Sequence, residues 1–253
     1  MEHIKASLES QLGSTPCTIE DTEEIFWLRE SDDWQSKIVL GNALSAQYRF
    51  RDAIGAYSAA LRIRSDDPML YIRLGGAYLT LFRFDEAMDA YERSLALGID
   101  KKTVAFPMGI WYYFRKDDIA AAEWFAQCLP CGDEMKIAVI YWHTLCCLRA
   151  NITPALLSEF HSDMNVGHHT AYCFAVSVFV GEMDADTALA QLEDEKDDLN
   201  YVIAAYGLCG HLFAVGRIKE SDALRQKLLV RGKVWPCVAY LAAVGDGEAC
   251  GCF

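Results

Sequence analysis

The chain has 253 residues, of which 53% are hydrophobic and 23% are charged, and this composition is typical of a folded protein rather than a disordered one. Its 36 acidic and 23 basic residues give a net charge of −13, which repels nucleic acid and anionic membrane surfaces. The longest uncharged runs, 164–181 and 199–216, have 18 residues each but are interrupted by polar residues such as His168, His169 and Asn200, so no membrane span is predicted. The N-terminus lacks the apolar core of a signal peptide. We therefore expect a cytoplasmic protein with no membrane span and no nucleic-acid partner.

Residues 1–33 are predicted to form an N-terminal helical hairpin. Gly13-Ser14-Thr15-Pro16 has the composition of a turn, and it lies between a polar segment and a helix expected to begin near Thr18. The chain that follows repeats with a period of about 34 residues, and this turn lies one such period before the next predicted turn.

Residues 34–130 are predicted to form three repeats of two helices each. Small and aromatic residues recur at fixed columns with one period, which is a strong signal of a repeat architecture. Seven columns agree over the three copies: Leu40, Leu74 and Met108; Gly41, Gly75 and Gly109; Leu44, Tyr78 and Tyr112; Ala53, Ala87 and Ala121; Tyr57, Tyr91 and Phe125; Ala60, Ser94 and Cys128; Leu61, Leu95 and Leu129. The small columns are expected where the two helices touch. Within the third copy, Pro107 predicts a kink or a late helix start.

The second copy carries a resemblance to a known family. Its Tyr71, Leu74, Gly75 and Tyr78, followed by Ala87 and Tyr91, resemble the tetratricopeptide repeat (TPR) pattern, although the usual late proline is Ser65 or Ile99 here. The resemblance implies an all-α fold, a right-handed superhelical α-solenoid of about six to seven helix-turn-helix repeats. It also implies a protein-interaction role, with a concave face lined mainly by the first helix of each pair.

Beyond the clear repeats, the spacing of the turns persists. Turn signals at Ala150-Asn151, Gly181 and Gly216 predict three divergent TPR-like hairpins over residues 131–232. Residues 233–253 are predicted to form a C-terminal capping helix, over about 234–244, and a loose tail that carries Cys250 and Cys252.

The resemblance also implies which residues line the concave groove. It assigns partner binding to Ile38, Asn42, Met69, Ile72, Arg73, Phe106, Ile110, Tyr113 and Phe114. Such an apolar groove would bury the side chains of a partner peptide or helix, with Arg73 fixing a partner acid. A chaperone-type carboxylate clamp is disfavoured, because Ile38 stands where that clamp has lysine. A register error of one residue would instead make the aromatic residues inter-repeat core.

Two other groups of residues could carry chemistry. Cys128 and Cys131 form a C-x-x-C pair at a helix end, and with His143 and Cys146 they have a spacing acceptable for zinc. For the C-x-x-C pair and for the zinc spacing, packing is the favoured interpretation, since Cys128 occupies a small-residue column of the repeat. Another group, His161, His168 and His169, has no matching carboxylate motif and is interpreted as loop surface.

We therefore predict a non-enzymatic, cofactor-free adaptor or chaperone-like scaffold that binds a protein or peptide partner. No phosphate-binding glycine loop, H-E-x-x-H or G-x-S-x-G motif is present in the sequence. The alternatives are a thiol- or zinc-dependent protein that uses Cys128, Cys131, His143 and Cys146, and a structural assembly subunit. Neither the partner nor the oligomeric state follows from the sequence.

Overall fold

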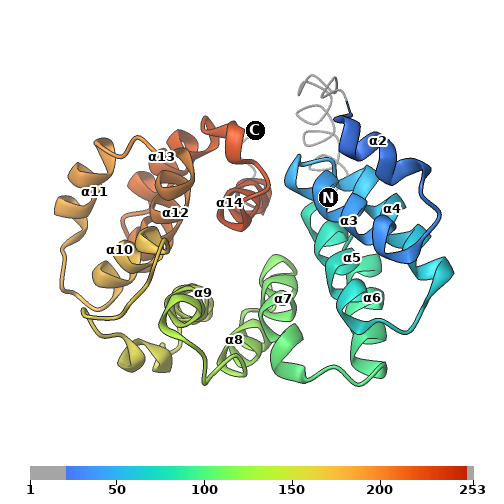
Figure 1. The fold of residues 1–253 in the computed structure, drawn as a ribbon. Coiled ribbons are helices and arrows are strands. Elements are labelled where there is room, and N and C mark those ends of the chain that lie inside the picture. The colour runs from blue at the N-terminus through green and yellow to red at the C-terminus, as the bar shows by residue number, and fades with distance from the viewer. Residues whose placement is uncertain (1–20, 250–253) are drawn as a thin grey trace. The chain divides into compact units, whose positions relative to one another are not determined.

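The computed structural model describes residues 21–249 of the backbone, and it is all-α over that range, as the sequence predicts (Figure 1). Thirteen α-helices and two short 3-10 helices occur among these residues, without a β-strand. The turn predicted at Gly13 to Pro16 and the cysteines of the tail lie outside the described residues. The chain forms two compact units, divided between Pro107 and Met108, and each is described by itself.

Unit 1 is a stack of antiparallel helix pairs. Its helices are α2 (Glu23–Glu30), α3 (Trp34–Ala46), α4 (Phe50–Ile63), α5 (Pro68–Thr80) and α6 (Phe84–Ala96). Helix α3 pairs with α4, α5 pairs with α6, and α4 packs against α5. Aspartates cap both first helices: the Asp33 carboxylate accepts from the Ser36 amide at the start of α3, and Asp67 caps α5 ahead of Pro68 in the first turn. These are the TPR-like hairpins that the repeat predicts.

One contact recurs in every clear repeat: a glycine of the first helix lies against an aromatic ring of the second. A Cβ atom built on Gly41 would lie 2.3 Å from the Tyr57 ring, and one on Gly75 would lie 2.4 Å from the Tyr91 ring. At Gly109 the same atom would lie 2.7 Å from the Phe125 ring. No Cβ atom fits at these distances, so the glycine column makes room for the aromatic ring against the first helix.

The turns inside the hairpins share a second feature. Tyr48, Phe82 and Lys116, which occupy the same column of the three repeats, all have positive φ angles, between 54° and 63°. Gly181 and Gly216 have φ angles of 80° and 81° at the later turns. A left-handed residue reverses the chain after a helix, which places the second helix antiparallel to the first.

Unit 2 is organised around two helices that are buried on all sides. Its elements are α7 (Lys101–Phe114, whose first turns belong to unit 1), α8 (Asp118–Ala126), α9 (Asp133–Ala150), η1 (Ala155–Glu159), α10 (Thr170–Phe179), α11 (Ala185–Glu193), α12 (Asp198–Ala214), α13 (Ile218–Leu229), η2 (Gly232–Val234) and α14 (Val238–Ala249). Buried residues run without a break over 137–147 of α9 and 201–209 of α12. Helix α12 contacts α9, α10, α11, α13 and α14, so it forms the centre of this unit.

Two local features differ from the sequence expectations. After α9 ends at Asn151, residues 152–169 contain only the short η1, where a second hairpin helix was expected. Pro154 lies at the start of η1 and Gly167 takes a positive φ of 54°, and both disfavour a continuous helix. Helix α7 begins at Lys101, so Pro107 lies inside it and does not delay its start.

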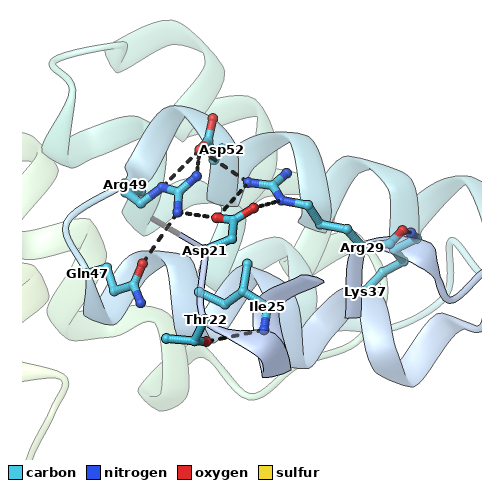
Figure 2. Close-up of polar contacts among 8 residues, drawn as sticks. All are labelled: Asp21, Thr22, Ile25, Arg29, Lys37, Gln47, Arg49 and Asp52. Atoms are coloured by element: carbon cyan, nitrogen blue, oxygen red, sulfur yellow. Dashed lines mark hydrogen bonds and ion pairs between the residues drawn. The ribbon is translucent and has the colours of Figure 1, made fainter. Parts of the chain in front are cut away.

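The first described helix, α2, is fixed by ion pairs as well as by burial of Ile25. Figure 2 shows the Asp21 carboxylate between two guanidinium groups, 2.6 Å from Nε of Arg29 and 2.5 Å from Nη1 of Arg49. Arg49 also contacts Asp52 at 2.7 Å. The hydrogen bonds from Arg29 and then Arg49 hold the pKa of Asp21 below its usual 3.8.

The glycine–aromatic contact gives a sharp stability test with a neighbouring control. We expect Gly75→Ala to destabilise unit 1 by about 1 to 3 kcal/mol, because the new methyl group overlaps the Tyr91 ring. Gly76→Ala, one residue further along α5, meets no atom within 4 Å and should stabilise the helix by up to about 1 kcal/mol. Urea unfolding followed by circular dichroism measures both, and equal effects of the two variants would contradict the contact.

The docking of α2 should weaken in acid. A carboxyl whose pKa is depressed on folding stabilises the folded state above its unfolded pKa, and that contribution disappears as the pH falls below about 4. We expect Asp21→Asn to speed amide exchange in α2 at neutral pH, whereas Asp32→Asn, at an exposed position, should leave it unchanged. Hydrogen–deuterium exchange of residues 23–30 measures this. Similar exchange in both variants would show that the ion pairs do not hold the helix.

Candidate functional site

The first five predicted groove residues lie together on unit 1, on its first helices α3 and α5. We call Ile38, Asn42, Met69, Ile72 and Arg73 the α3–α5 face. Met69 is 41% exposed and Arg73 is exposed, while the other three are half-buried. Apolar and polar side chains therefore reach the surface side by side.

A hydrogen-bond network joins the two helices of this face. The side-chain oxygen of Asn42 accepts from the Tyr57 hydroxyl at 3.0 Å and from Nη1 of Arg73 at 3.3 Å. The Tyr57 hydroxyl in turn lies 3.3 Å from the Ser45 hydroxyl. Because both donors point at the oxygen, the amide group of Asn42 has a fixed orientation, with its NH2 group directed away from them.

The donors of this face are only partly used. Within residues 21–249, the Asn42 amide nitrogen has no acceptor and the Arg73 guanidinium has no acidic partner. The face therefore presents an exposed cation and an amide donor beside Ile38, Met69 and Ile72. These two hydrogen-bond donors can bind an acidic or carbonyl oxygen of a ligand while the apolar side chains pack beside it.

The four remaining predicted groove residues, on α7, lie in different surroundings. Ile110 and Tyr113 are only 2% and 1% exposed, so in this conformation they belong to the core and cannot contact a partner. Phe106 and Phe114 are half-buried. For Tyr113 the cause is plain: its ring lies edge-on to Trp142 of α9 and Tyr206 of α12.

A polar network that the sequence did not predict includes Tyr113. Its members are Tyr113, Lys116, Arg149, Tyr206 and Asp246. The hydroxyls of Tyr113 and Tyr206 lie 2.6 Å apart, and that of Tyr206 donates to the Asp246 carboxylate at 2.7 Å. Lys116 forms an ion pair with the same carboxylate. The network therefore ties the C-terminal helix α14 to α7, α9 and α12.

Arg149 completes the network at the end of α9. Its guanidinium pairs with Asp118 at 2.7 Å, lies 3.6 Å from the Asp246 carboxylate and stacks 3.9 Å from the centre of the Tyr113 ring. Burial raises the pKa of both tyrosines well above its usual value, so both stay neutral and can donate hydrogen bonds. The sequence predicts a capping helix that ends near residue 244, followed by a loose tail. Helix α14 instead extends to Ala249 and carries Asp246 into this network.

The cysteine chemistry considered from the sequence is not supported. Cys128 and Cys131 are free thiols, and burial raises the pKa of both, that of Cys128 to about 12. A protonated thiol is a poor nucleophile and a poor metal ligand. In the described part of the chain, no three of the four proposed zinc ligands, Cys128, Cys131, His143 and Cys146, bring donor atoms within 4.8 Å of one another.

Comparisons with known proteins assign the chain to no family. No protein-family model and no curated protein matches the chain. Among solved structures, YrrB, described as a TPR protein with an unusual peptide-binding site, has a TM-score of 0.49 and 14% identity, over 90% of this chain and 99% of that one. Among the described helices, none is both long and apolar enough to cross a membrane.

The Asp246 network should contribute measurably to stability. We expect Asp246→Asn to destabilise unit 2 by about 1 to 3 kcal/mol, since it leaves the half-buried Arg149 and the exposed Lys116 without their shared carboxylate. Asp66→Asn removes an exposed ion pair with Arg64 and should change stability by less than about 1 kcal/mol. Thermal unfolding of both variants provides the comparison, and equal shifts would contradict a structural role for Asp246.

Proposed function

We propose that this chain is a non-enzymatic protein-interaction module, adaptor or chaperone-like in its action, and that a partner segment binds on the α3–α5 face. The observation that carries the proposal is that the exposed Met69 and the half-buried Ile38 and Ile72 accompany a cation that has no acidic partner among the described residues. Met69 and Arg73 lie one helical turn apart on α5, and Asn42 faces them from α3.

The face favours a segment of particular chemistry. Ile38, Met69 and Ile72 would bury one or two apolar side chains of the partner, which provides most of the affinity in such contacts. Arg73 would pair with an acidic side chain or a C-terminal carboxylate. The Asn42 amide would donate to a main-chain carbonyl of the partner.

This proposed site is smaller than the groove expected from the sequence. It excludes Ile110 and Tyr113, because their side chains are buried within unit 2. A segment bound along α3 and α5 needs only a short apolar–acidic motif, and an interface of that size is typical of weak, transient contacts. The cytoplasmic location expected from composition fits such a role and stays part of the proposal.

A charge reversal on this face tests the proposal. Partners captured by the full chain from lysate would be identified by mass spectrometry, and binding of the partner segment would then be measured with purified peptide. We expect Arg73→Glu to weaken binding at least about tenfold, because one charge-assisted contact of roughly 1.5 to 3 kcal/mol becomes repulsive. Ile72→Ala should weaken it less.

The matched control is Arg62→Glu, which makes the same charge change at an exposed position on α4, the second helix of its hairpin. Partner binding should be unchanged in this variant. Equal loss in Arg62→Glu and Arg73→Glu would point to net charge alone, and full binding by Arg73→Glu would place the partner on another surface.

A further inference from the structure

A carboxylate and two histidines meet at the start of α9, although residues 135–167 separate them in the sequence. Nδ1 of His168 lies 2.8 Å from Oε1 of Glu134. His169 adds a second imidazole, and one donor atom from each of the three residues lies within 4.8 Å of the others. The rings of the two histidines are 4.5 Å apart.

The second imidazole is already oriented as in a metal site. Nδ1 of His169 lies 2.5 Å from the main-chain carbonyl of Glu134, an acceptor, so this nitrogen carries the proton and donates it. The other ring nitrogen, Nε2, then has a free lone pair. Metal-binding histidines typically have this arrangement, in which a backbone carbonyl fixes the tautomer and the ring direction.

The segment that carries the histidines is held against α9 before any ligand binds. The Asn165 amide donates to the Asp133 carboxylate at 3.2 Å. Gly167 has a φ of 54°, and a Cβ atom there would lie 2.7 Å from Oε1 of Glu134. The positive φ favours glycine at this position, and the backbone there already brings the segment close to the Glu134 side chain.

We propose that Glu134, His168 and His169 form a binding site for a divalent transition-metal ion, with Zn²⁺ the best fit. Two imidazoles and one carboxylate are ligands that Zn²⁺ commonly takes. Two ligands of a tetrahedral Zn²⁺ lie about 3.4 Å apart, which is shorter than the 4.8 Å within which these three donors lie. Binding would replace the contact between His168 and Glu134 with bonds from both residues to the ion.

The site has a structural consequence for unit 2. The ion would join α9 to residues 165–169. These residues belong to the segment after α9 that contains η1 in place of the expected second helix of the hairpin. Three protein ligands leave one coordination position for water or for a donor from a partner. This inference departs from the cofactor-free expectation and does not depend on the α3–α5 face.

Zinc affinity of the full chain is the test, measured after chelator treatment by competition with a chromophoric chelator in a thiol-free reductant. We expect one strongly bound Zn²⁺, with affinity reduced at least about tenfold in Glu134→Gln and His169→Ala, since even the loss of a group that only orients a ligand costs that much. His168→Ala should do the same, and its side chain is 83% exposed, so the fold is not at risk. His161→Ala, an exposed histidine of the same segment, should bind as the wild type does.

Cobalt separates this site from the cysteines. Co²⁺ bound by Glu134, His168 and His169 should lack the intense near-ultraviolet band of thiolate ligands. Wild-type affinity in all three ligand variants would overturn the proposal, and so would a thiolate band that disappears in Cys131→Ser.

Discussion

The fold of the repeats depends on the contact between a glycine on one helix and an aromatic ring on the next. Gly41, Gly75 and Gly109 each lie where a Cβ atom would overlap the ring. The rings of Tyr57, Tyr91 and Phe125 occupy the space that a side chain at the glycine would take, and all three are buried. A glycine inside a helix costs roughly 1 kcal/mol relative to alanine, and the large area that the ring buries offsets that cost.

The two units use their first helices differently. In unit 1, α3 and α5 keep several side chains half-buried or exposed, among them Asn42 and Arg73. In unit 2, α9 and α12 are buried on all sides, and α14 packs on α12 with its Asp246 held by Tyr206. A helix that is apolar all round serves as core rather than as a recognition surface. The surface available for a partner therefore follows from the composition of each first helix.

The features that the sequence predicted well are local ones. The repeat period, the glycine column and the turns at Gly181 and Gly216 all depend on residues close in the chain. The all-α fold followed from them. The groove was predicted less well, because burial of Tyr113 depends on Trp142 and Tyr206, which are contributed by helices far along the chain.

The same reasoning explains why Glu134 was not associated with His168 and His169. No spacing motif joins the start of a helix to the far end of the irregular segment that follows it, and the two come together because η1 replaces a helix and lets the chain fold back onto α9. Loss of regular structure in one hairpin thus exposes side chains that a second helix would have covered. In repeat proteins, a hairpin that departs from the pattern is therefore a place to look for chemistry that the regular hairpins do not have.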